Sequence, residues 1–129
     1  MQALERIMLV EDDPDIRTVV VMALEMVGGL QVEACESGAQ ALEKVAAWAP
    51  QLVLLDVMMP GMNGPEVLGA FRARADTSAI PVIFLTAKAQ ESEIQALRDL
   101  GALDVIPKPF DPMTLTDAVR ALWDRHQKA

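Results

Sequence analysis

The amino-acid sequence predicts an α/β fold: a doubly wound, five-stranded parallel sheet with five helices packed on its two faces. Three observations support this class. Short apolar runs alternate with longer amphipathic stretches along the chain, as consecutive β-α units do. The runs are continuously apolar, which is typical of strands covered on both faces. Several of them end abruptly in polar residues, as strands do where they reach the edge of a sheet that carries a site.

The expected elements follow one another in regular β-α order. Strands are expected at residues 6–10, 31–34, 52–56, 82–85 and 104–106. Helices are expected at residues 14–27, 39–48, 65–74, 91–100 and 113–125. No repeat, low-complexity segment or linker interrupts this order.

Capping residues and helix breakers set the ends of the first two helices. Asp13 is a favourable N-cap, and Pro14 suits the first helical turn. Gly28, followed by a second glycine, is a typical C-terminal stop. Ser37 is expected to cap the second helix, which must end before Pro50.

The same signals bound the later helices. The third helix is expected to begin near Pro65 and to end before the polar stretch at residues 76–78. The fourth helix stops at Gly101. The fifth begins after Asp111 and Pro112.

Composition limits the class of protein. A chain of 129 residues with 52% hydrophobic and 23% charged residues is expected to form one globular domain, residues 1–129. Its net charge of -8 argues against direct nucleic-acid binding, which needs clustered Lys and Arg. The longest apolar stretch, residues 19–30, is too short for membrane insertion, and no signal peptide is visible. We therefore expect a cytoplasmic protein, whose eight methionines mostly fill the core.

Five polar residues lie at the ends of four of the expected strands and are candidates for a site. Glu11 and Asp12 follow the first strand, Asp56 ends the third, Thr86 follows the fourth and Lys108 follows the fifth. Carboxylates about 5 Å apart repel one another by roughly 3 kcal/mol at an effective dielectric of ~20. A divalent cation relieves that cost, and hard oxygen ligands favour Mg²⁺ or Mn²⁺. A divalent ion and a lysine beside an aspartate can neutralise a phosphoryl group while the aspartate attacks phosphorus.

Each of these residues also has a purely structural explanation. Asp13, the third acid of the run, is expected to act only as a helix cap. Asp56 could form an Asx turn before Pro60. Thr86 could be an ordinary strand-end residue, and Lys108 a solvated loop lysine. Only their joint occurrence at the strand ends indicates a site.

The order of these motifs resembles the receiver domain of two-component response regulators. The resemblance covers essentially the whole chain and rests on four motifs in the right order and spacing: IMLVEDD at 7–13, LDVMMPGMNG at 55–64, LTAK at 85–88 and KPF at 108–110. It implies the flavodoxin-like receiver fold, with strand order 2-1-3-4-5.

The resemblance implies a role for each acidic residue. Asp56 would be the phosphoacceptor, charged from a phosphohistidine on a sensor histidine kinase or a histidine phosphotransfer protein. Asp12 would bind Mg²⁺ directly together with Asp56, and Glu11 mainly through water. The backbone carbonyl of Met58 would complete the set of protein ligands to Mg²⁺, or to Mn²⁺ in its place.

The resemblance also assigns the remaining polar residues. Thr86 would be the switch hydroxyl and Lys108 the phosphate-binding lysine, joined to Pro109 by a cis peptide bond. The family usually carries an aromatic residue three positions before this lysine, but here the residue is Val105 and the chain has no Tyr. The aromatic part of the family's switch is therefore not expected in this protein.

We expect a phosphoacceptor module that signals by contact with a downstream protein, and not an enzyme beyond its own phosphorylation and slow aspartyl-phosphate hydrolysis. Residues 113–117 do not resemble receivers attached to winged-helix DNA-binding domains, so the dimer of those receivers is not well supported. Two alternatives stay open. A haloacid-dehalogenase-type phosphatase would need Asp-x-Asp where this chain has Glu11-Asp12-Asp13. An unphosphorylated receiver-like binding module would be indicated by loss of an acid or of the lysine.

Overall fold

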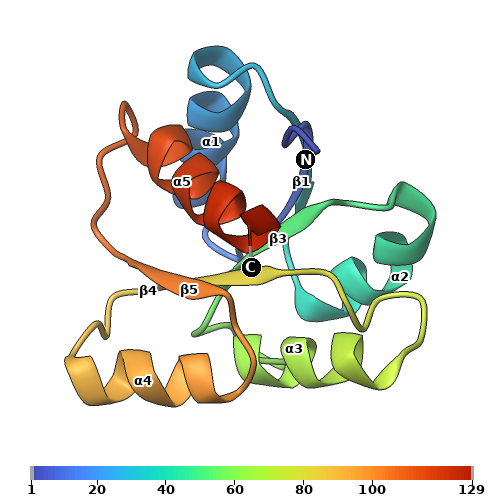
Figure 1. Cartoon of the computed structure of the whole chain (residues 1–129). Helices are drawn as coiled ribbons and strands as arrows, with labels where there is room; N and C mark the ends of the chain where they lie inside the picture. The colour runs from blue at the N-terminus through green and yellow to red at the C-terminus, as the bar shows by residue number, and fades with distance from the viewer. Residues whose placement is uncertain (1, 129) are drawn as a thin grey trace.

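A computed structural model of the chain describes residues 2–128 and shows one five-stranded sheet with helices on both sides (Figure 1). Every strand pair is parallel, and the strand order is β2-β1-β3-β4-β5. The strands are β1 (Arg6–Val10), β2 (Gln31–Cys35), β3 (Leu52–Asp56), β4 (Val82–Thr86) and β5 (Asp104–Pro107). The helices are α1 (Pro14–Met22), the π-helical turn η1 (Ala23–Val27), α2 (Gly38–Trp48), α3 (Gly64–Ala73), α4 (Glu91–Asp99) and α5 (Leu115–Lys128). The expected fold class and strand order are confirmed.

Two apolar cores lie on the two sides of the sheet. Successive strand residues point to opposite faces, so Ile7 and Leu9 of β1 pack with α1 and α5, whereas Met8 and Val10 pack with α2, α3 and α4. All residues of β3 and β4 are buried. These two strands are therefore covered on both faces, as their continuous apolar sequences predicted. Within residues 2–128 no helix is both long enough and apolar enough to span a membrane.

The expected strands agree with the structure to within one residue at each end, but two helices differ. The fifth helix was expected from residue 113 and begins at Leu115, because Asp111 forms a turn whose side chain accepts a hydrogen bond from the Met113 N–H at 2.9 Å. The first helix ends in the π-helical turn η1, which the sequence analysis missed. The Thr116 hydroxyl of α5 donates to the Ala23 carbonyl at 3.2 Å there, a contact between residues far apart in sequence.

Candidate functional site

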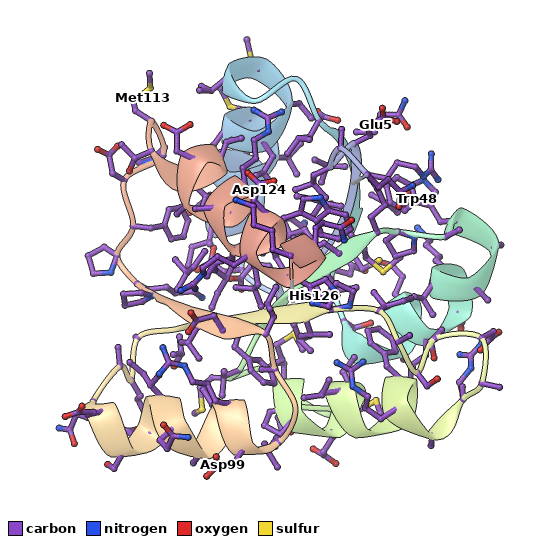
Figure 2. The ribbon with its side chains drawn as sticks, viewed as in Figure 1. Glu5, Trp48, Asp99, Met113, Asp124 and His126 are labelled. Carbon is purple, nitrogen blue, oxygen red and sulfur yellow. The ribbon has the colours of Figure 1, made fainter. Side chains whose placement is uncertain are left out.

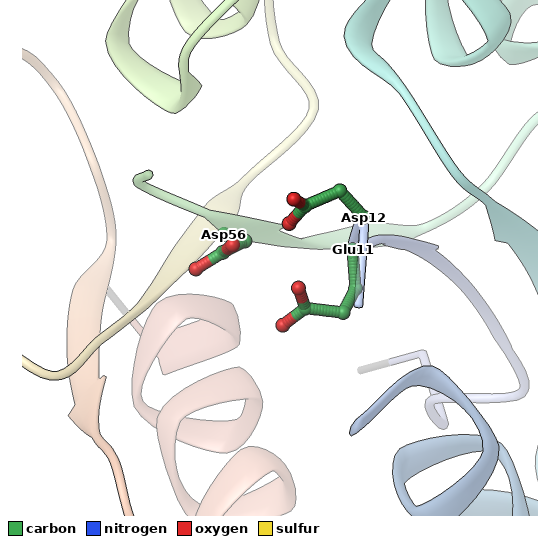
Figure 3. Close-up of side chains that lie close together, drawn as sticks. All are labelled: Glu11, Asp12 and Asp56. Carbon is green, nitrogen blue, oxygen red and sulfur yellow. The ribbon is translucent and has the colours of Figure 1, made fainter. Parts of the chain in front are cut away.

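Three carboxylates meet where β1 and β3 end (Figure 3). The two strands are neighbours, with Val10 paired to Leu55, so Glu11 and Asp12 follow β1 beside Asp56, the last residue of β3. One oxygen from each side chain lies within 4.8 Å of the other two. Such a cluster of hard oxygen donors fits a divalent cation such as Mg²⁺.

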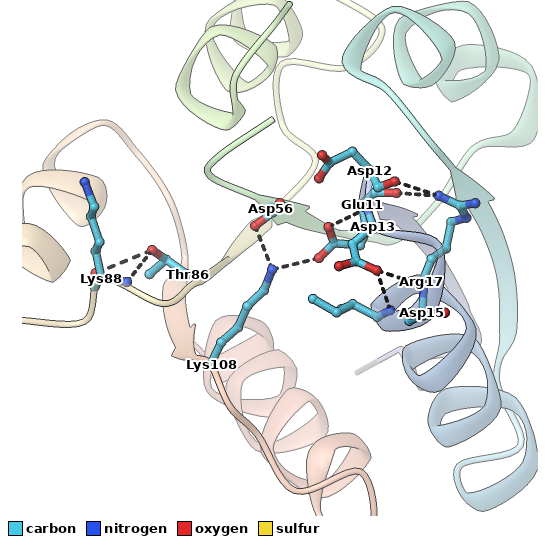
Figure 4. Close-up of polar contacts among 10 residues, drawn as sticks. Glu11, Asp12, Asp13, Asp15, Arg17, Asp56, Thr86, Lys88 and Lys108 are labelled. Atoms are coloured by element: carbon cyan, nitrogen blue, oxygen red, sulfur yellow. Dashed lines mark hydrogen bonds and ion pairs between the residues drawn. The ribbon is translucent and has the colours of Figure 1, made fainter. Parts of the chain in front are cut away.

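Lys108 joins this cluster from the loop after β5 (Figure 4). Its Nζ lies 2.8 Å from Oε1 of Glu11 and 2.9 Å from Oδ1 of Asp56. The main chain is held in place because the Lys108 N–H donates to the Thr86 carbonyl at 2.8 Å. The expected cis peptide bond between Lys108 and Pro109 is present.

Burial dominates the electrostatics of the cluster. Glu11 has no solvent-exposed surface, and its burial, together with repulsion from Asp56, raises its pKa to about 7 against the opposing hydrogen bonds from Lys108 and the Asp13 N–H. Burial alone would lower the pKa of Lys108, but its hydrogen bonds to Glu11 and Asp56 outweigh that effect and raise it. The ammonium group is therefore firmly charged and holds two carboxylates together.

Asp12 is the acid of the cluster that Lys108 does not contact. Among residues 2–128, its carboxylate takes part in no hydrogen bond or ion pair, whereas Lys108 pairs with both Glu11 and Asp56. It is also the most solvent-accessible of the three acids. Asp12 therefore presents open carboxylate oxygens to an incoming cation.

Thr86 is buried at the end of β4, but its hydroxyl is engaged within its own loop. Its Oγ1 accepts a hydrogen bond from the Lys88 N–H at 3.0 Å (Figure 4). Its role toward a phosphoryl group stays a prediction, as does that of the Met58 carbonyl, which lies in the loop after β3. Asp13 is confirmed as the cap of α1, since its carboxylate accepts from the Asp15 N–H at 2.8 Å.

Two residues that shape the site, Gly64 and Arg17, were not predicted from the sequence. A side chain in place of Gly64 at the start of α3 would put its Cβ 2.5 Å from the carbonyl oxygen of Asp56. Arg17 of α1 donates from Nη1 to the Glu11 carbonyl at 2.9 Å. The Asn63-Gly64 pair gave no signal for the first, because Asn63 serves as the N-cap of α3 and Gly64 is required by close packing. A lone arginine inside an amphipathic helix gave no signal for the second.

An apolar groove, which was also not predicted from the sequence, runs from the site along α1. One cavity of about 440 Å³ lies between Ile16 and Val19 of α1, Ala87, and the loop from Lys108 to Pro112. A second cavity of about 300 Å³ shares Val19 and Pro112 with it and is also lined by Met22, Ala23, Met26, Val27 and Met113. Figure 2 shows Met113 projecting from the loop before α5. The expectation that methionines mostly fill the core is therefore wrong, since Met22, Met26, Met58 and Met113 are exposed, Met26 to 77%.

The comparison with known families agrees with the geometry. Residues 7–120 match the response regulator receiver domain. The chain belongs to this family. Solved receivers share its fold: the chemotaxis protein CheY4 of Vibrio cholerae is 29% identical, with 93% of this chain and 99% of that chain covered and a TM-score of 0.85. The signal receiver domain of a histidine kinase from Syntrophus aciditrophicus is also 29% identical, with 97% and 94% covered and a TM-score of 0.81.

Curated relatives include longer transcription regulators. The DNA-binding response regulator MtrA of Mycolicibacterium smegmatis is 37% identical over 123 residues, which are 95% of this chain and 52% of MtrA. The transcriptional regulatory protein CseB of Streptomyces coelicolor is 38% identical over 119 residues, 92% of this chain and 49% of CseB. The chain thus spans about half the length of these relatives. Their names give no support to the expectation that nucleic acid is not a partner, and the family match gives none to the phosphatase alternative.

Proposed function

We propose that this receiver accepts a phosphoryl group on Asp56 from a phosphohistidine of a sensor histidine kinase or a phosphotransfer protein. The observation that carries the proposal is the contact of one buried ammonium, that of Lys108, with both Glu11 and Asp56 at 2.8 and 2.9 Å, beside the open carboxylate of Asp12. A structural ion pair would need a single acid. Three acids around one lysine leave negative charge in excess, as a site for a divalent cation requires.

In the proposed reaction an oxygen of the Asp56 carboxylate attacks phosphorus. A P–O bond forms, the P–N bond to the donor imidazole breaks, and the imidazole leaves with the electron pair. Lys108 exchanges its contact with Asp56 for one with a phosphoryl oxygen. Its ammonium group then stabilises the negative charge on the phosphoryl group in place of that on the Asp56 carboxylate. The Thr86 hydroxyl donates to the Lys88 carbonyl at 3.5 Å, and it would exchange that acceptor for a second phosphoryl oxygen.

The carboxylates of Glu11, Asp12 and Asp56, with the carbonyl of Met58, are the proposed ligands of Mg²⁺. When bound, the cation neutralises oxygens of the phosphoryl group. Among the described residues, the carboxylate oxygens of Asp12 form no hydrogen bond, whereas the carboxylate of Glu11 accepts one from Lys108. Asp12 is therefore the acid whose oxygens are most available to the cation.

The phosphodonor is proposed to dock along the apolar groove beside α1. The groove is lined by α1 and by the loop after β5, and both of these segments lead to the site. Helix α1 follows the loop that carries Glu11 and Asp12, and the loop after β5 carries Lys108. A helix bearing the phosphohistidine, laid with its apolar face in this groove, brings its imidazole to Asp56. Exposed Met22 and Met26 supply adaptable apolar contacts farther along.

The described domain is proposed to act in the cytoplasm and to pass its signal by contact with a downstream protein, without turnover of a separate substrate. The net charge of -8 supports an output that does not use direct phosphate contacts by this domain. Relatives twice as long leave room for an output through a further segment.

Incubation of the whole chain with acetyl phosphate tests the phosphoacceptor. We expect one added phosphoryl group by intact mass with Mg²⁺ and none with EDTA. Asp56→Asn should abolish the added mass, whereas Asp99→Asn, an exposed acid on α4, should leave it unchanged. Labelling of Asp56→Asn equal to the parent would show that another residue accepts the phosphoryl group.

A further inference from the structure

Arg17 contacts the acidic loop through its main chain and not through its carboxylates. From the second turn of α1, its Nη1 donates to the carbonyl oxygens of Glu11 at 2.9 Å and Asp12 at 3.4 Å (Figure 4). Within residues 2–128 it forms no ion pair with any acid. A half-buried guanidinium beside several carboxylates would ordinarily pair with one of them, so this arrangement needs an explanation.

The loop is fixed at both ends, and Arg17 is the side chain that contacts the carbonyls between them. The Glu11 N–H donates to the Cys35 carbonyl at 3.0 Å, and Asp13 is held as the cap of α1 with its N–H donating to Glu11 Oε2 at 3.2 Å. The peptide groups between them carry the two acids, which repel each other and Asp56. At 4.8 Å each pair repels by about 3.5 kcal/mol at an effective dielectric of ~20. Rotation of the peptides that follow Glu11 and Asp12 would relieve this repulsion by turning the side chains apart.

We propose that Arg17 is a positioning residue: it holds the carbonyls of Glu11 and Asp12 so that both carboxylates face Asp56 and that of Asp12 stays open to a divalent cation. The inference rests on the proposed function, because it assigns Arg17 to the metal-dependent reaction of the same site. Contact with the carbonyls leaves the carboxylate oxygens of Asp12 unused, whereas an ion pair between Arg17 and Asp12 would occupy them.

The charge and the hydrogen bonds of Arg17 have opposite effects on metal affinity. A positive charge near the cluster repels Mg²⁺, so a purely electrostatic role predicts that a neutral substitution tightens binding. Positioning predicts that the same substitution weakens binding, because the acids turn away from one another. The sign of the change in affinity therefore separates the two roles.

The test is the Mg²⁺ dissociation constant of the whole chain, measured by calorimetry. We expect two variants to weaken binding: Arg17→Met, which has no donor, and Arg17→Gln, whose amide nitrogen lies two bonds short of the Nη1 position that contacts the carbonyls. For Arg17→Met the loss should be on the order of tenfold, as it is when a residue that orients metal ligands is removed. Arg17→Lys, which keeps a donor for the carbonyls, should restore most of the affinity. Arg120→Gln is the matched control, because Arg120 also donates to a backbone carbonyl, that of Gly28 at 2.7 Å, remote from the acids.

Unchanged or tighter Mg²⁺ binding by Arg17→Gln overturns the proposal, as does an equal loss in Arg120→Gln. If Arg17→Met does not fold, Arg17→Gln and Arg17→Lys carry the test. Labelling with acetyl phosphate gives a second readout: the Mg²⁺ concentration for half-maximal rate should rise in Arg17→Gln, while the rate at saturating Mg²⁺ changes much less. If the parent chain is never labelled, the phosphoacceptor proposal fails, and calorimetry still decides the role of Arg17.

Discussion

Substitution of Asp12 by asparagine should make the metal-free protein more stable and its response to Mg²⁺ weaker. Asp12 is the acid of the cluster that Lys108 does not contact, and one of its oxygens lies within 4.8 Å of an oxygen of both Glu11 and Asp56. Asparagine has nearly the same shape but carries no charge. The substitution therefore removes repulsion without opening a cavity.

The structure sets the size of this effect. Two pairs at 4.8 Å repel by about 3.5 kcal/mol each at an effective dielectric of ~20. Lys108, bonded to both partners of Asp12, offsets most of one pair, and salt screens the remainder because Asp12 is partly exposed. We expect a net gain of about 1–2 kcal/mol in the free energy of unfolding, or roughly 3–8 °C in Tm.

Thermal melts in EDTA and in excess Mg²⁺ measure both effects. The parent should gain stability from Mg²⁺ by mass action, and Asp12→Asn should gain much less. Asp124→Asn, an exposed acid on α5 (Figure 2), is the control for net charge and should change stability by less than about 0.5 kcal/mol. An Asp12→Asn protein less stable than the parent in EDTA would refute the crowding of these acids, and an equal gain in Asp124→Asn would assign it to total charge.

Three further predictions follow from single contacts. Because the folded-state pKa of Glu11 is raised to about 7, the unfolding free energy of the metal-free protein should fall as pH rises from 4.5 to about 7; urea titrations should show no such fall in Glu11→Gln. Gly64→Ala, with its Cβ 2.5 Å from the Asp56 carbonyl, should cost about 1–3 kcal/mol in thermal melts, and Gly69→Ala, in open space on α3, should not destabilise. With beryllofluoride, amide shifts should change mainly at the ends of β3 and β4; equal changes along β5 around Val105 and α5 would contradict this.

The fold could be predicted because its signals are local in sequence. Each strand is an apolar run and each helix is bounded by a cap or a breaker, so Asp13 and Ser37 were identified as caps before any tertiary contact was known. The π-helical turn could not be predicted, because no pattern within residues 14–29 indicates it. Its Ala23 carbonyl accepts from the Gly28 N–H at 3.2 Å and also from the Thr116 hydroxyl of α5 at 3.2 Å, a partner far away in sequence.

The acidic cluster was predictable for a different reason: parallel strands end at the same edge, so strand-end residues meet. That rule brought Glu11, Asp12, Asp56 and Lys108 together as the structure has them. The rule does not predict how each side chain is oriented. The hydroxyl of Thr86, for example, is hydrogen-bonded within its own loop and not to the acidic cluster. Arg17 lies outside the rule, because it reaches the edge from a helix and not from a strand.

Helix α1 joins three features that the sequence presents separately. Its cap, Asp13, ends the acidic loop, Arg17 holds that loop by its carbonyls, and Ile16 and Val19 line the groove where the phosphodonor is proposed to dock. A helix laid in the groove would press on the same turn of α1 that carries Arg17. Docking of the donor and binding of the metal would then both depend on helix α1. A protein donor would therefore shift Glu11 and Asp12 into better positions for the metal. A small donor such as acetyl phosphate does not fill the groove, so with it the positions of these two acids would depend on Arg17 alone.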